Sequence, residues 1–218
     1  MKKISILILS VILMMGVSGC MNNSENTSKK TIGEKALIYM ENKYNEKFNY
    51  IGSTDGGFDA DNRTLLISPQ NNSDIQIDVS YHNNKGYEEY AENYTQIKYK
   101  EKTKELIENL LVDIFKTEVI VDYEYGCSVN NFSETTSFEQ FIKNEESAIS
   151  FYAVISPEYV IDDIEEIKQL ILKRCESEFS YCRCNIYFAP TKDEFLSYYD
   201  LPVWKIDEMS KIQFGIGE

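Results

Sequence analysis

The sequence is poor in the residues on which many active sites depend. Its 218 residues include one histidine, His82, and one tryptophan. A single imidazole excludes metal sites built from several histidines. No serine lies in a G-x-S-x-G motif or in S-x-x-K with its partner motifs, and no phosphate-binding or dinucleotide-binding glycine motif is present. His82 ends an alternating segment and precedes two asparagines, so we expect it to be an exposed turn residue.

Basic residues are also few relative to acidic ones. The chain has 22 Lys and Arg against 36 Asp and Glu, which gives a net charge of −14. Nucleic acids and anionic membrane surfaces both attract clusters of Lys and Arg. We therefore expect no nucleic-acid partner and no direct contact between the folded domain and an anionic bilayer. The negative charge favours cationic partners or simply keeps the protein soluble.

The N-terminus carries a short apolar run. Lys2 and Lys3 precede Ile4–Val17, 14 residues without a charge. A helix that crosses a bilayer needs about 20 apolar residues, so this run is too short for one. A basic start, a short apolar stretch and small residues are typical of a secretory leader.

The motif Val17-Ser18-Gly19-Cys20 follows and resembles the lipobox of bacterial lipoproteins. In composition the chain is also similar to small uncharacterised lipoproteins of low-GC Gram-positive bacteria. The resemblance implies cleavage before Cys20, a diacylglyceryl group on its thiol and a protein held on the extracytoplasmic side of the cell membrane. Residues 1–19 are then a signal peptide, and residues 20–31 are the lipidated cysteine and a flexible polar tether. Cleavage removes two lysines and no acid, so the net charge changes from −14 to −16.

Residues 32–218 are expected to form a single α+β domain. Apolar residues recur at helical spacing over about 33–47, 98–116 and 160–177, and shorter helices are expected over about 138–143 and 191–199. Alternating segments predict strands around 50–51, 64–68, 75–81, 119–125, 149–155 and 182–188. The acidic and aromatic segment Tyr87–Tyr94 is interpreted as a short helix or an irregular loop.

The order of these elements suggests a topology. From Ile75 the chain reads strand, long helix, strand, and then strand, long helix, strand again. We expect two βαβ-type units, either in a ferredoxin-like layout or in a larger antiparallel sheet with helices on one face. An N-terminal helix and a hairpin complete the predicted fold.

Four cysteines remain once Cys20 is lipidated, namely Cys127, Cys175, Cys182 and Cys184. Cys182 and Cys184 alternate along a strand and face the same side, near the outer limit for bridging each other. Cys175 and Cys182 flank a helix-to-strand turn and form the preferred disulfide pair. Reduced, buried thiols are the alternative.

Acidic residues gather in the loop that contains Asp55, Asp59 and Asp61. Hard cations such as Ca²⁺ bind carboxylates, but the sequence departs from the EF-hand pattern directly after Asp61. We expect a solvated hairpin loop and no metal site. Asp59 and Asp61 are still the best placed residues for the alternative hypothesis below.

Tyrosine is abundant, with 16 residues. Tyr87, Tyr90 and Tyr94 lie in one segment, where their rings could stack on sugars or anchor a protein partner. The leading hypothesis is a non-enzymatic, lipid-anchored binding module without a cofactor, whose partner is an extracellular protein or an envelope component. The alternative is a carboxylate-dependent envelope hydrolase.

Overall fold

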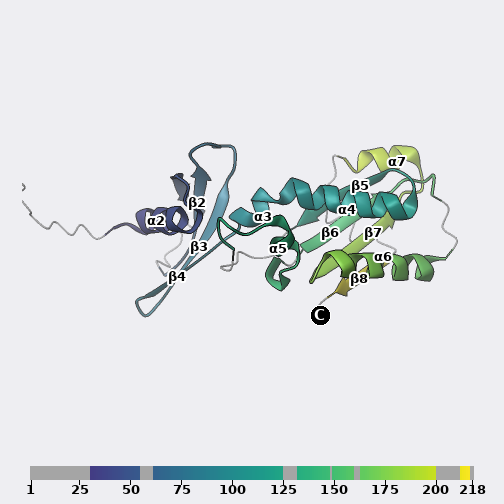
Figure 1. Cartoon of the computed structure of the whole chain (residues 1–218). Coiled ribbons are helices and arrows are strands. Elements are labelled where there is room, and N and C mark those ends of the chain that lie inside the picture. Colours follow the sequence, from purple (N-terminus) through teal and green to yellow (C-terminus); the bar gives the residue numbers. More distant parts are fainter. Residues whose placement is uncertain are drawn as a thin grey trace, which may run out of the picture. The chain divides into compact units, whose positions relative to one another are not determined.

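The computed structural model describes residues 30–54, 61–124, 132–147, 149–159, 163–199 and 212–216 (Figure 1). The predicted signal peptide, Cys20 and nearly all of the predicted tether lie outside these residues. The chain from Ile32 onward forms one compact unit that contains two four-stranded sheets and several helices. The predicted α+β class is confirmed. None of the described helices is long and apolar enough to span a bilayer.

The first sheet is an antiparallel meander. Its strands are β1 (Phe48–Ser53), β2 (Asn62–Pro69), β3 (Ile77–Asn84) and β4 (Tyr87–Glu92), in that order across the sheet. Helix α2 (Ile32–Tyr44), which was predicted over about 33–47, packs on one face of this sheet. The shared core consists mainly of Ala36, Met40, Tyr44, Phe48, Leu65, Ile67, Ile77 and Val79.

Strand β4 corrects the expectation of a helix or loop at Tyr87–Tyr94. Lys85 and Gly86 both have positive φ, 53° and 92°, and form the two-residue turn between β3 and β4. Two-residue turns of this kind match the twist of the flanking strands and give tight hairpins. Glutamate is unfavourable in strands on average, so the acidic composition of this segment argued against a strand. The two-residue turn and the pairing with β3 outweigh that preference here.

The second sheet contains a parallel pair. Its strands are β5 (Val119–Glu124), β6 (Ile149–Ile155), β7 (Cys182–Phe188) and β8 (Ile212–Ile216). β6 and β7 are parallel, and the two outer pairs are antiparallel. Helix α6 (Ile164–Glu178) connects β6 to β7, so one of the two predicted βαβ units is present.

The other predicted βαβ unit is not formed. Helices α3 (Tyr94–Lys98) and α4 (Lys100–Phe115) lead from the first sheet to the second, because β3 and β5 belong to different sheets. β3 already has a strand on each side, β2 and β4, which leaves no position for β5. The layout is therefore neither ferredoxin-like nor one larger antiparallel sheet.

The second sheet has its own core. Helices α4 and α6 cover one face together with α5 (Phe138–Ile142), and α7 (Lys192–Ser197) lies on part of the other face. The helix expected over about 138–143 begins with a capping box, in which Gln140 N–H donates to Ser137 Oγ at 3.1 Å and Ser137 N–H donates to Gln140 Oε1 at 2.8 Å. The larger core includes Ile107, Leu111, Phe141, Ile149, Phe151, Ala153, Ile155, Ile171, Cys175 and Ile186.

Candidate functional site

The three tyrosines of the predicted patch have different surroundings. The side chain of Tyr87 is exposed and that of Tyr90 is half-buried. Tyr94 is buried, with its ring centroid 4.9 Å from that of Tyr44, and its hydroxyl donates to Glu46 Oε2 at 2.6 Å. Tyr94 is therefore a core residue and not part of a surface patch, because it lies after β4 ends, at the start of α3.

Tyr87 and Tyr90 line a cleft of about 650 Å³, which we call the β4 cleft. Its lining consists of residues 87–90 of β4, Tyr39 and Lys43 of α2, and Phe132 with Ser133. The rings of Tyr39 and Tyr90 stack, with centroids 5.0 Å apart and an interplanar angle of 21°. The volume lies within the range of about 300–1,000 Å³ that is usual for ligand sites.

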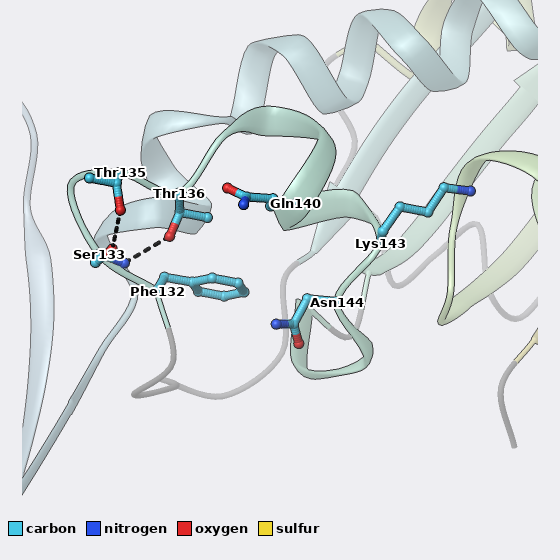
Figure 2. A pocket seen from close by; sticks show the side chains of 7 residues that line it. All are labelled: Phe132, Ser133, Thr135, Thr136, Gln140, Lys143 and Asn144. Carbon is cyan, nitrogen blue, oxygen red and sulfur yellow. Dashed lines mark hydrogen bonds between the residues drawn. The ribbon is translucent and has the colours of Figure 1, made fainter.

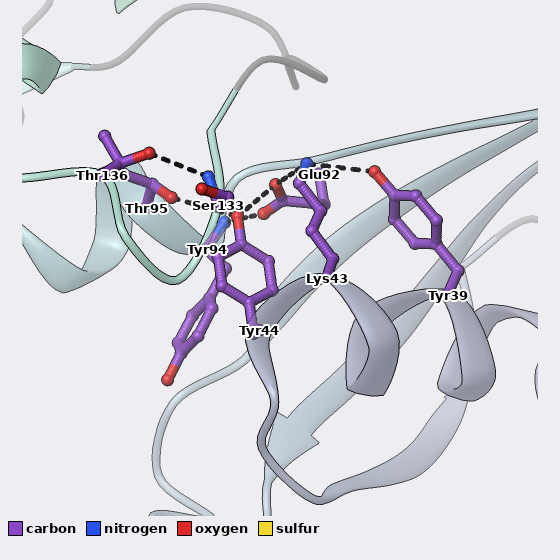
Figure 3. A network of polar contacts seen from close by, with 8 residues as sticks. All are labelled: Tyr39, Lys43, Tyr44, Glu92, Tyr94, Thr95, Ser133 and Thr136. Carbon is purple, nitrogen blue, oxygen red and sulfur yellow. Dashed lines mark hydrogen bonds and ion pairs between the residues drawn. The ribbon is translucent and has the colours of Figure 1, made fainter.

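A buried ion pair lies beside the cleft (Figure 3). The Glu92 carboxylate, whose side chain has no exposed surface, accepts hydrogen bonds from Lys43 Nζ at 2.8 Å and from the Tyr44 hydroxyl at 2.6 Å. The backbone N–H of Tyr94 donates to its second oxygen. Buried charges are stable only when they are paired and hydrogen-bonded, and both conditions are met here.

Lys43 connects this pair to the tyrosines of the cleft. Its Nζ donates to the Tyr39 hydroxyl at 3.1 Å, and it lies 5.4 Å and 5.5 Å from the ring centroids of Tyr39 and Tyr44. Such distances allow a cation–π attraction. The Lys43 ammonium therefore fixes the position of Tyr39, which is one ring of the stacked Tyr39–Tyr90 pair. The backbone of Lys43 is also held, because its carbonyl accepts from Glu134 N–H at 3.4 Å.

Glu88 carries the charge at the other end of the cleft. Lys35 Nζ lies 2.5 Å from Glu88 Oε1, and the hydroxyls of Tyr81 and Tyr90 donate to the same carboxylate at 3.3 Å and 3.5 Å. The hydrogen bond from Lys35 lowers the pKa of the Glu88 carboxyl. Glu88 is therefore ionised at neutral pH and is suited to recognition rather than to general-acid catalysis.

The predicted acidic loop is only partly described. Asp55 and Asp59 lie outside the described residues. Asp61 is exposed, and its Oδ1 accepts from the side-chain amide of Asn83 at 3.1 Å. His82 is exposed as expected, but it lies within β3 and contacts the Asn62 side chain instead of forming a turn. In the described ranges, no group of three or more His, Cys, Asp or Glu is arranged to hold a metal ion.

Three of the five cysteines are described, and Cys20 and Cys127 are not. Cys175, Cys182 and Cys184 are buried, free thiols. A hydrogen bond with Cys182 and burial raise the pKa of the Cys175 thiol, and burial raises that of Cys184. Thiols with raised pKa values are weakly reactive. Cys175 and Cys182 thus lie together as expected, and the disulfide between them stays a prediction.

A second hollow of about 430 Å³ shares Phe132 and Ser133 with the β4 cleft (Figure 2). The rest of its lining is polar and consists of Thr135, Thr136, Gln140, Lys143 and Asn144. Several of these groups stabilise local structure, since Thr136 Oγ1 accepts from Ser133 N–H at 2.9 Å and Gln140 belongs to the cap of α5. We therefore take the β4 cleft, with its aromatic surface, as the candidate site.

Sequence reasoning found Tyr87 and Tyr90 but missed most of the other residues of this site. Tyr39 and Lys43 are four residues apart and share one side of α2, a spacing that places side chains next to each other. Glu88, Tyr90 and Glu92 alternate along β4 and face α2 together. Both signals were present in the sequence, but the second has meaning only once the segment is known to be a strand.

The buried tyrosines predict a loss of stability at alkaline pH. Burial raises the pKa of the Tyr44, Tyr90 and Tyr94 hydroxyls, whereas tyrosine in an unfolded chain titrates near pH 10. Above about pH 10 the unfolded chain loses protons that the folded chain keeps, so the free energy of unfolding falls. Thermal scans from about pH 7 to pH 12 should show Tm decrease slightly from about pH 8.5, where the thiols of the unfolded chain ionise while Cys175 and Cys184 stay neutral, and decrease more steeply above about pH 10. A constant Tm up to pH 12 would show that these hydroxyls are not held neutral by the fold.

No family model and no curated protein sequence matches the chain. The chain is similar to the crystal structure of a DUF5037 family protein from Ruminococcus gnavus, with 12% identity over 85% of this chain and 90% of that chain, and a TM-score of 0.42. A similarity of this size transfers no function.

Proposed function

We propose that the protein is a lipid-anchored, extracytoplasmic binding module without enzymatic activity, and that its ligand site is the β4 cleft. The lipobox-like motif Val17–Cys20 supports the anchoring and the location. The binding role rests on one observation, the stacked Tyr39–Tyr90 pair beside the exposed Tyr87 in a cleft of about 650 Å³. The partner is an extracellular protein or an envelope component.

The cleft has the properties of a preorganised site. The ion pair between Lys43 and Glu92 and the one between Lys35 and Glu88 tie α2 to β4. A site held by such contacts loses little conformational freedom when a ligand binds, so more of the contact energy contributes to affinity. Tyrosine rings offer a large contact area at low entropic cost, which is why they are frequent at binding surfaces.

The alternative, a carboxylate-dependent hydrolase, receives less support from the described residues. Hydrolysis by two carboxyl groups needs one protonated acid and one ionised base. In the cleft, Lys35 keeps Glu88 ionised, and the Glu92 carboxylate is engaged by Lys43 and Tyr44. The Asp59–Asp61 site remains a hypothesis.

Tyr87→Ala tests the binding role. The full chain, solubilised in detergent, is titrated by calorimetry with two probes, an octapeptide of alternating lysine and tyrosine and a tetramer of N-acetylglucosamine. We expect one probe to bind and Tyr87→Ala to weaken it about tenfold, since a central aromatic residue contributes more than 1 kcal/mol. Tyr199→Ala, which removes an equally exposed ring near α7, is the matched control. If neither probe binds, or if the two variants behave alike, the proposal is wrong.

A further inference from the structure

Strand β4 is an edge of the first sheet. Among the described residues no strand pairs with its outer side, and all six of its residues pair with β3 in an unbroken register. The opposite edge, β1, has an irregular register between Tyr50 and Gly52. An unbroken edge offers a row of N–H and C=O groups to which another strand can pair. β4 is therefore the edge of this sheet better suited to receive one.

The outward backbone groups of β4 belong to Glu88, Tyr90 and Glu92, of which Glu88 and Tyr90 line the cleft. The two-residue turn makes Asn84 and Tyr87 the hydrogen-bonded pair that closes the hairpin, and such pairs alternate along an antiparallel ladder. Asn83 lies opposite Glu88, and its N–H accordingly points away from β4. It donates to the backbone carbonyl of Asp61 at 2.7 Å, on the β2 side of the sheet. No described residue hydrogen-bonds to the backbone of Glu88 or Tyr90 from the outer side. These groups lie along the cleft itself.

The side chains along this edge favour an alternating ligand. An added strand would place successive side chains on opposite faces. On the α2 face they would meet the stacked rings of Tyr39 and Tyr90, and on the other face they would meet Tyr87 and Glu89. Aromatic pairs and pairs of opposite charge are the favourable contacts between neighbouring strands.

The charged groups around the β4 cleft favour a positively charged ligand. The lysines beside the cleft are neutralised, Lys35 by Glu88 and Lys43 by Glu92. Glu89 is exposed and forms no ion pair within the described part of the chain. With a net charge of −14 on the whole chain, a cationic ligand is attracted and an anionic one repelled.

We propose that the β4 cleft binds an extended, cationic peptide segment, which adds to the first sheet as a fifth strand next to β4. This inference rests on the proposed function and specifies its ligand. The peptide backbone pairs with Glu88 and Tyr90, aromatic side chains contact the stacked tyrosines, and basic side chains lie near Glu89. Strand addition of this kind derives affinity from main-chain hydrogen bonds and specificity from alternate side chains.

The test compares peptides and backbone variants on the detergent-solubilised full chain. The lysine–tyrosine octapeptide is titrated beside a glutamate–tyrosine octapeptide of the same length, which we expect to bind at least about tenfold more weakly. Glu88→Pro removes one outward N–H, which an edge strand tolerates, and Glu88→Gln keeps that N–H while removing the same charge. We expect the proline variant to bind about fivefold more weakly than the glutamine variant, the effect of one lost hydrogen bond.

Hydrogen exchange of the unchanged chain covers the case in which Glu88→Pro does not fold. The bound octapeptide should slow exchange of the Glu88 and Tyr90 amides. Equal binding of the two octapeptides, or amides that exchange at the same rate with and without peptide, would overturn the inference.

Binding of the sugar tetramer alone, with loss of that binding in Tyr87→Ala, would overturn the inference and leave the proposed function standing. A dimer that dissociates in Glu88→Pro but not in Glu88→Gln would show that a second copy occupies the edge, which also overturns it. Failure of every probe would contradict both proposals.

Discussion

Lys43→Met is expected to lower the free energy of unfolding by about 3–5 kcal/mol. The substitution keeps most of the side-chain volume and removes the ammonium group. The Glu92 carboxylate then stays buried with only the Tyr44 hydroxyl and the Tyr94 N–H as partners, and its charge is no longer compensated. Removing one member of a buried pair costs much more than the pair contributes, because the remaining charge keeps its desolvation penalty. Urea unfolding followed by circular dichroism measures the change.

Two further variants separate burial from charge. Lys47→Met removes a lysine that lies between α2 and β1 from an exposed ion pair with Glu41, where the side chain of Lys47 is 70% exposed, and should cost no more than about 1 kcal/mol. The double variant Lys43→Met/Glu92→Leu removes both charges and should recover part of the loss, because no uncompensated charge remains. A Lys43→Met variant as stable as Lys47→Met would show that the pair beside the cleft is not buried as described.

Cys20→Ser is expected to abolish lipid attachment. A serine has no thiol to form the thioether, so the chain should accumulate as an unprocessed precursor or leave the membrane. The expected effect is large because each buried CH₂ group of an acyl chain contributes about 0.8 kcal/mol to membrane binding. Two chains therefore anchor a protein stably, whereas a protein with a single chain binds the membrane reversibly. Labelling of producing cells with an alkyne fatty acid, followed by membrane fractionation, measures both outcomes.

Cys127→Ser provides the matched control for this experiment. It removes another thiol from the chain and leaves the lipobox-like motif unchanged, so it should be labelled and fractionate like the natural sequence. Equal labelling of Cys20→Ser and Cys127→Ser would rule out the assignment of Cys20 as the lipidated residue.

Local patterns predicted most of the elements but not all of the pairing. Apolar spacing placed α2, α4 and α6, and short helices were expected close to where α5 and α7 lie. The order of elements gave the parallel unit β6–α6–β7. The same order failed for β3 and β5, because a sequence of strand, helix and strand does not say whether both strands join one sheet. β8 was missed because it has only five residues and includes Gly215, a residue type that strands disfavour.

The candidate site was predicted only in outline. Tyr87 and Tyr90 do line a cleft, whereas Tyr94 is buried, since the segment changes from strand to helix between them. Tyr39 and Lys43 come from a helix that lies about 50 residues earlier in the chain, and only the packing of α2 on the first sheet brings them to β4. The sequence alone offers no rule that predicts contacts between residues so far apart in the chain. The net negative charge follows from the composition, and the tethered location stays a prediction from one short motif.

The central claim is that the β4 cleft is the ligand site of the anchored protein, and hydrogen exchange in its native setting tests it most directly. Exchange is measured by mass spectrometry for peptides that cover β4 and α7, first in isolated membranes of the producing cell and then after purification in detergent. An occupied cleft predicts slower exchange of β4 in the membranes and equal exchange of α7 in both samples. Exchange of β4 that is the same in both samples would contradict the claim.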